Sequence, residues 1–402
     1  MWNARRLIAI MCAGVLLAQI DTSVVNLILR HVQAAFDAPF SALRWVVDGY
    51  NVAYGATILA SGALADRYGR RAIFLLGIAV FTGGSLLCAL APNIAALVAG
   101  RVVAGIGGAL EMPATLAILT LAFDEPLRAR ALGAWASMNG LAFIVGPTAG
   151  GLLAGAFGWR SVFLLAVPLG VLILASGGAL PETRGARAHA EALGLFADRP
   201  FGLTLAAIAA MTFGMYGMLF LTPYLLQTVA HRSVTETGLL LLPMSVAFVL
   251  TANLAGALSG RIGRRAIATL GMTLMASGCA ALAVTDPRGT LGVIGAMTLT
   301  GVGLGCATAS LLGFAAERAP NALAGSASAY ANAARMAGAT LGVLFASYPG
   351  GAVVELAGAL AAFAAFGAGQ RIYPAAEEPL VSAVERCSST LCSASRKRSG
   401  AS

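Results

Sequence analysis

The sequence predicts an all-α integral membrane protein with twelve transmembrane helices arranged as two six-helix parallel repeats. First, 58% of the 402 residues are hydrophobic and only 11% are charged, whereas about a quarter of the residues of a soluble domain are charged. Second, apolar stretches of about 20 residues, long enough to cross a bilayer as a helix, recur from end to end. Third, the decapeptide GALADRYGRR at 62–71 returns as GALSGRIGRR at 256–265.

The apolar stretches fall into two groups of six, separated by a polar segment at 181–200. This spacing predicts an N-terminal half (1–180), a cytoplasmic linker (181–200), a C-terminal half (201–370) and a disordered tail (371–402). The first stretch follows MWNARR without a small-residue cleavage site, so we expect it to be retained and not removed as a signal peptide. The predicted spans lie near 7–29, 43–65, 72–91, 94–122, 131–155, 160–179, 201–226, 237–259, 266–285, 290–315, 323–347 and 351–369.

The basic residues give the orientation of these spans. Of the 26 Lys and Arg residues, 19 fall on the side of the two termini and five on the opposite side, and Arg101 and Arg335 lie inside spans. Cytoplasmic loops carry the excess of positive charge, so both termini are expected in the cytoplasm. The net charge of +9 is therefore a membrane-topology signal, and no nucleic-acid partner is expected.

The repeated decapeptide extends into a longer internal match. Residues 62–77 and 256–271 share 11 identities in 16 positions at an offset of 194 residues. Each copy joins the second and third predicted helix of its half. This pattern is typical of parallel repeats within one membrane protein.

Four motifs resemble those of the major facilitator superfamily, a fold of two parallel six-helix repeats. GALADRYGRR resembles its loop signature, RVVAGIGG at 101–108 its fourth-helix signature, and GPTAGG at 146–151 the fifth-helix signature associated with antiporters. IDTSVVNLIL at 20–29 resembles the first-helix motif of a drug:proton antiporter branch that usually has fourteen helices. Residues 181–200 are too few for the two extra helices, so a twelve-helix variant is expected.

This resemblance implies a proton-coupled antiporter that exports small, largely apolar molecules such as drugs, antibiotics or toxic metabolites by alternating access. A proton symporter importing a specific metabolite is the alternative on the same fold. A membrane enzyme is less favoured, because no catalytic cluster lies at a membrane face. The expected setting is a bacterial inner membrane, and the expected partners are a small-molecule substrate, protons and membrane lipid, with the protein acting as a monomer.

The resemblance also assigns two groups of residues. The loop is expected to act as a conformational switch, in which Asp66 meets the start of the eleventh helix near 322–324 and steadies the outward-open state. GPTAGG is expected to form a tight seal that prevents proton leak, or to serve ordinary close packing. The switch residues are Gly62, Asp66, Arg67, Gly69, Arg70 and Arg71, and the antiporter-motif residues are Gly146, Pro147, Gly150 and Gly151.

Ionisable residues inside spans are candidates for function, because charges are costly in hydrocarbon. Glu111 lies nearest the midplane, beside Pro113. Removal from water there favours the neutral form of the carboxyl, which suits a group that takes up and releases protons. The alternative is a permanently neutral carboxyl, or one held by a hydroxyl such as that of Thr115. Arg101 is expected to pair with Asp21 or Asp48. The predicted proton-coupling residues are Glu111, Asp21 and Asp48, and the predicted substrate-cavity residues are Asn26, Asn51, Arg101 and Arg335.

Helical geometry leaves the role of Asp21 open. At about 100° per residue, Gln19, Thr22, Ser23 and Asn26 share one face of the first helix, and Asp21 points nearly opposite to Gln19. Either Asp21 or the polar face turns toward the cavity. On the second helix, Asp48, Asn51, Gly55 and Gly62 lie on one stripe, for which a cavity lining is the favoured use and packing between helices the alternative.

No cofactor or metal is expected from the sequence. Lys397 is the only lysine, so neither a phosphate-binding P-loop nor a Schiff-base lysine is available. The three histidines fall in loops, and the six cysteines match no metal spacing. No structural disulfide is expected either.

Overall fold

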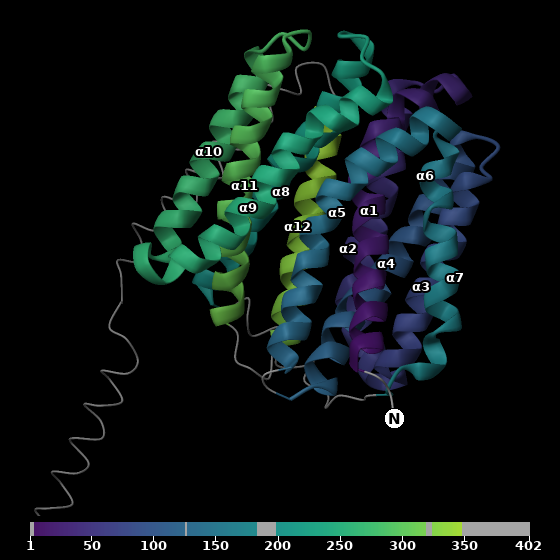
Figure 1. Cartoon of the computed structure of the whole chain (residues 1–402), viewed down its shortest axis with the longest axis vertical. Helices are drawn as coiled ribbons and strands as arrows, with labels where there is room; N and C mark the ends of the chain where they lie inside the picture. The colour runs from purple at the N-terminus through teal and green to yellow at the C-terminus, as the bar shows by residue number, and fades with distance from the viewer. Residues whose placement is uncertain (1–3, 125–126, 183–197, 319–323, 348–402) are drawn as a thin grey trace, which may run out of the picture.

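The computed structural model describes residues 4–124, 127–182, 198–318 and 324–347, and every element within these ranges is a helix. Long helices alternate in direction along the vertical axis of Figure 1, with the N-terminus at the lower end. The elements are α1 (Ala4–Phe36), α2 (Phe40–Tyr68), α3 (Arg70–Ala89), α4 (Ile94–Ala122), α5 (Leu127–Phe157), α6 (Arg160–Leu164), α7 (Ala166–Ala175), the 3-10 turn η1 (Gly177–Ala179), α8 (Arg199–Thr228), α9 (Val234–Ile262), α10 (Arg264–Val284), α11 (Thr290–Arg318) and α12 (Ala324–Ala346).

The helix bounds follow the 194-residue offset found in the sequence. Helix α9 begins and ends 194 residues after α2, and α10 begins 194 residues after α3. The glycine between the two helices has a positive φ in both copies, 101° at Gly69 and 87° at Gly263. Only glycine adopts this conformation without strain, which explains why both copies of the loop have glycine at this position.

The two halves pack their helices in the same way. Helix α4 packs on α2 and α3 as α11 packs on α9 and α10, and α1 packs on α5 as α8 packs on α12. Between the halves, α2 contacts α12 and α5 contacts α9. Figure 1 shows the halves side by side, with α5 and α12 in the middle of the molecule.

Eight of the described helices are long and apolar enough to cross a membrane: α1, α3, α4, α5, α8, α9, α10 and α11. Helices α2 and α12 are also long, with 29 and 23 residues, but they carry polar residues in their middle. The span expected at 160–179 is divided into α6, α7 and η1. Pro168 accounts for the break at Leu165, because its ring clashes with the carbonyl of Leu164 and it donates no hydrogen bond.

Some predictions concern residues that the structure does not describe. The twelfth span near 351–369 and the tail at 371–402 lie outside the described ranges, as does most of the linker at 181–200. The division into two halves with these boundaries therefore stays a prediction.

Side-chain caps fix the start of two helices at the upper end of Figure 1. The Asn93 side chain accepts a hydrogen bond from the backbone N–H of Ala96 at the start of α4. Ser233 and Glu236 form a reciprocal capping box at the start of α9. These two caps define where the chain turns back into the bundle.

Candidate functional site

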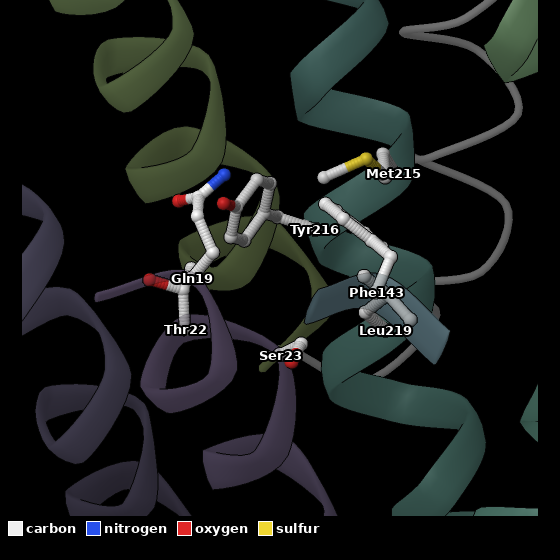
Figure 2. Close-up of a pocket in the computed structure, with 7 residues that line it drawn as sticks. All are labelled: Gln19, Thr22, Ser23, Phe143, Met215, Tyr216 and Leu219. Carbon is white, nitrogen blue, oxygen red and sulfur yellow. The ribbon is translucent and has the colours of Figure 1, made fainter. Parts of the chain in front are cut away.

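A small cavity of about 10 Å³, with room for about one water molecule, lies between the two halves. In Figure 2, α1 contributes polar side chains from one side, and α8 with Phe143 of α5 contributes mainly apolar ones from the other. The Tyr216 hydroxyl points toward the Gln19 side chain in this view. The lining residues are Gln19, Thr22, Ser23, Phe143, Met215, Tyr216 and Leu219.

Asp21 is turned away from this cavity and forms an ion pair with Arg101. The Arg101 Nη1 atom lies 2.6 Å from Asp21 Oδ2, and Nε donates to the Val46 carbonyl at 2.9 Å. The guanidinium also lies over the Tyr50 ring, 4.6 Å from its centroid. The expected pairing of Arg101 is confirmed, with Asp21 as the partner, and the face of α1 that lines the cavity is the polar one.

This ion pair is buried, since Arg101 is 1% and Asp21 6% exposed. Pairing and hydrogen bonding together offset the cost of removing both charges from water. The pair joins α1 to α4, and the Val46 contact adds α2. Arg101 was predicted to line the substrate cavity. In the structure it lies within the N-terminal half, where Asp21 and the Val46 carbonyl bind its guanidinium.

Asp48, Asn51 and Asn26 are buried polar residues with incomplete hydrogen bonding. They are 3%, 1% and 3% exposed. Within the described part of the chain, Asp48 Oδ1, Asn51 Nδ2 and Asn26 Oδ1 have no hydrogen-bond partner. Such groups are uncommon in folded proteins, because leaving a buried polar atom unpaired costs about 1–3 kcal/mol.

Glu111 is the most isolated of the buried acids. Its side chain is 0% exposed, and neither carboxyl oxygen has a hydrogen-bond partner among the described residues. The Thr115 hydroxyl donates to the Met112 carbonyl at 2.7 Å and accepts from Trp135 Nε1 at 3.0 Å, so it does not hold Glu111. Burial without a partner penalises the charged form of a carboxyl.

Arg335 lies on α12 where the two halves meet. It is half-buried, and its Nη1 atom donates to Asn332 Oδ1 at 3.1 Å. Its neighbour Met336 packs against Gly55 of α2, where a Cβ atom would lie 3.1 Å from the Met336 Cβ. Because α12 packs on α2 and on α8, Arg335 lies at the boundary between the halves.

The loop between α2 and α3 is contacted by an acid that the sequence analysis missed. Glu182 follows η1, and its Oε1 atom accepts a hydrogen bond from the Arg71 backbone N–H at 3.3 Å. A carboxylate is favourable at the N-terminus of a helix, here α3. The side chain of Asp66 and residues 319–323 lie outside the description, so the contact expected between Asp66 and the eleventh helix stays a prediction.

The GPTAGG segment brings α5 close to one helix of each half. A Cβ atom added at Gly146 would overlap Ser23, and one at Gly150 would overlap Val24, both on α1. Gly151 faces α9 of the other half, and its carbonyl accepts a hydrogen bond from Thr235 Oγ1 at 3.0 Å. Small residues here let α5 approach both helices.

We expect Gly150→Ala to destabilise the protein, because the new methyl group meets Val24, whose β-branched side chain has one preferred rotamer in a helix. Overpacking of this kind costs about 1–3 kcal/mol. Gly133→Ala is the matched control on the same helix, since open space surrounds Gly133. That control should gain up to about 1 kcal/mol from helix propensity. Thermal unfolding in detergent measures both changes, and equal shifts would contradict the close packing of α5 on α1.

Contacts near the C-terminal ends of α1 and α8 join the two halves directly. Gln227 Nε2 donates to the Leu27 carbonyl at 2.8 Å, and the Tyr224 hydroxyl donates to Gln33 Oε1 at 3.0 Å. The Phe40 ring lies 4.6 Å from the Tyr224 ring, centroid to centroid. These contacts were not predictable from the sequence, because hydrogen bonds between segments about 200 residues apart leave no local pattern.

Comparison with known proteins gives a family match over most of the chain. Residues 11–369 match the Major Facilitator Superfamily. The chain is 31% identical over 403 residues to the multidrug resistance protein Stp of Mycobacterium tuberculosis, covering 85% of this chain and 75% of that protein. It is 27% identical over 403 residues to the tetracenomycin C resistance and export protein of Streptomyces glaucescens, covering 84% and 75%.

A shorter match and a solved structure complete the comparison. Over 168 residues the chain is 42% identical to the methylenomycin A resistance protein of Bacillus subtilis, covering 42% of this chain and 36% of that protein. A bacterial homolog of the human lysosomal transporter Spinster, in an inward-facing and occupied conformation, aligns with a TM-score of 0.76 at 16% identity, over 91% of this chain and 96% of that one. At this identity the likeness shows the fold.

Proposed function

This chain belongs to the Major Facilitator Superfamily, and we propose that it is a proton-coupled antiporter that exports small, largely apolar molecules by alternating access. It is a multi-pass membrane protein of a transporter family and not an enzyme. The observation that carries the proposal is Glu111, a fully buried carboxyl without a hydrogen-bond partner in the described structure. Relatives that are named for drug resistance or export support the direction of transport.

Proton coupling is assigned to the buried acids. No described cation lies within hydrogen-bond distance of Glu111, so its carboxyl is free to change its protonation state as its surroundings change. Asp48 has one unpartnered oxygen and is the second candidate. Asp21 already has Arg101 as a partner, which makes it the weakest carrier while the pair is intact. Exchange then follows when substrate binding and protonation of the carboxyl exclude each other.

Alternating access requires that the two halves part at one end and close at the other. In the state described here, Gln227 and Tyr224 near the C-terminal end of α8 are hydrogen-bonded to α1, and this end of α8 lies at the upper end of Figure 1. The orientation that follows from the basic residues makes this the outer side of a bacterial inner membrane, with both termini in the cytoplasm. We assign these contacts to an outer gate and the 62–71 loop to a switch on the cytoplasmic side, in a protein that acts as a monomer.

Transport by purified protein in liposomes tests the direction of coupling. With a panel of neutral and permanently charged fluorescent dyes, antiport is expected to accumulate a dye in liposomes whose interior is acidic, because protons leave as the dye enters. Symport would accumulate the dye in liposomes with an alkaline interior. Protein-free liposomes and an ionophore that collapses the gradient are the controls. Accumulation only with an alkaline interior would replace the exporter by the symporter.

A further inference from the structure

Glu111 has no hydrogen-bond partner in the described structure, although a hydroxyl lies one helical turn away. Thr115 follows Glu111 by four residues on α4, and side chains with this spacing share one face of a helix. Both residues are fully buried. A hydroxyl that donates to a carboxylate forms a stronger hydrogen bond than one that donates to a neutral carbonyl. The missing bond between these two side chains therefore needs a physical cause.

Trp135 of α5 supplies this cause by binding the Thr115 hydroxyl. The indole Nε1 donates to Thr115 Oγ1 at 3.0 Å, and the hydroxyl donates its single proton to the Met112 carbonyl at 2.7 Å. A threonine in a helix divides between two side-chain rotamers. A hydrogen bond from the neighbouring helix favours the rotamer that it fits, and here that rotamer turns the hydroxyl toward Met112.

Trp135 is itself held by a chain of hydrogen bonds that reaches α1. Its carbonyl accepts a hydrogen bond from Asn139 Nδ2 at 3.0 Å, and Asn139 Oδ1 accepts one from Gln19 Nε2 at 2.9 Å. Helix α5 packs much more extensively on α1 than on α4. The contact between Trp135 and Thr115 is therefore a specific link from the pair of α1 and α5 to the turn of α4 that follows Glu111.

The other helices around Glu111 offer no hydrogen bond to its carboxyl in the described structure. On α3 the neighbour is Gly77, where a Cβ atom would lie 3.1 Å from the Glu111 Cβ. Tyr54 of α2 is a titratable side chain near Glu111, and Arg335 of α12 forms no ion pair with it. What Trp135 does to Thr115 therefore bears directly on whether Glu111 has a partner.

We propose that Trp135 is a positioning residue for proton coupling, because its bond to Thr115 holds that hydroxyl away from Glu111 and keeps the carboxyl free to exchange a proton. This inference rests on the proposed function and adds a residue that sets how readily Glu111 binds its proton. A hydroxyl that donated to Glu111 would favour the charged carboxylate. Glu111 would then hold its proton only at lower pH.

The infrared carbonyl band of protonated Glu111 tests this proposal, because a hydrogen bond to a carboxyl group lowers the frequency of the band. In the purified full chain at low pH, the band is identified as the signal that Glu111→Gln loses. It should shift to lower frequency in Trp135→Phe, where Thr115 is released. It should return to the wild-type position when Thr115→Val is added. Trp45→Phe is the matched control, because it removes the indole N–H from an exposed tryptophan.

Proton release induced by a transported dye gives a second readout. The pH range in which the dye releases protons should move about one pH unit lower in Trp135→Phe, since a hydrogen bond to a charged group favours the deprotonated carboxyl. The double variant with Thr115→Val should restore the wild-type range. A shifted band without a shifted pH range would overturn the role of Trp135 in coupling.

The dependence on Thr115 separates positioning from a general effect on packing. An unchanged band in Trp135→Phe, or a shift that persists in the double variant, would overturn the assignment of Trp135. If Trp135→Phe does not fold, Thr115→Val alone decides: the band should keep its wild-type position, and a move to higher frequency would show that Thr115 already binds Glu111. Undiminished proton release by Glu111→Gln would reject the proposed coupling residue, whereas the band positions would still decide whether Trp135 withholds Thr115.

Discussion

Glu111→Gln is expected to abolish transport driven by a pH gradient while leaving substrate binding and downhill exchange in place. Glutamine has nearly the shape of a protonated glutamate but cannot release a proton. The side chain is fully buried and its oxygens are unpartnered, so the substitution breaks no hydrogen bond of the described structure. We therefore expect normal folding and affinity within a few-fold of the wild type, together with loss of coupling.

Transport into liposomes with and without a pH gradient measures this effect. Asp37→Asn is the matched control, because Asp37 is exposed and has a positive φ of 46°, a conformation that asparagine also tolerates. Asp48→Asn should reduce coupling less completely than Glu111→Gln. Undiminished gradient-driven transport by Glu111→Gln would remove this residue from the mechanism and shift the assignment to Asp48 or Asp21.

The second large effect is expected at the buried pair of Asp21 and Arg101. Asp21→Asn leaves the Arg101 guanidinium buried without a counter-charge, and breaking a buried ion pair in this way costs about 3–5 kcal/mol of stability. Arg101→Gln leaves Asp21 unpaired in the same place. The double variant removes both charges together and should recover a substantial part of the stability lost by either single variant.

Thermal or denaturant unfolding of the four proteins in detergent gives the coupling energy of this pair. Arg101 also donates to the Val46 carbonyl and lies over the Tyr50 ring, so the double variant should stay below the wild type. Stability losses that simply add would show that the two charges do not depend on each other. Such a result would contradict the pairing on which the assignment of Asp21 rests.

The two-repeat architecture was predictable because each repeat contains the same short sequence motif. The decapeptide at 62–71 and 256–265 indicated the 194-residue offset. In the structure, Gly69 and Gly263 of the two copies both have a positive φ angle, which favours glycine at these positions. The break between α6 and α7 was missed, although Pro168 is visible in the sequence. A proline near the start of an apolar stretch is compatible with either a continuous or an interrupted helix.

The partners of the site residues were less predictable than their positions. Asp21 and Asp48 lie at similar predicted depths, so sequence alone did not decide which one Arg101 would meet; the rotation of α1 against α4 decides it. Glu182, Tyr216 and Gln227 were missed altogether. Their contacts join segments more than 100 residues apart or depend on which face of α8 meets the other half.

Substrate-induced proton release from the purified protein in detergent tests whether Glu111 exchanges its proton for the substrate. Adding a limiting amount of a transported dye at weakly alkaline pH should release protons from the wild type. This release should fall as the pH is lowered, because protons then compete with the dye. Glu111→Gln should release few or no protons while still binding the dye. Proton release of the same size from Glu111→Gln would contradict the claim that this buried carboxyl exchanges its proton for the substrate.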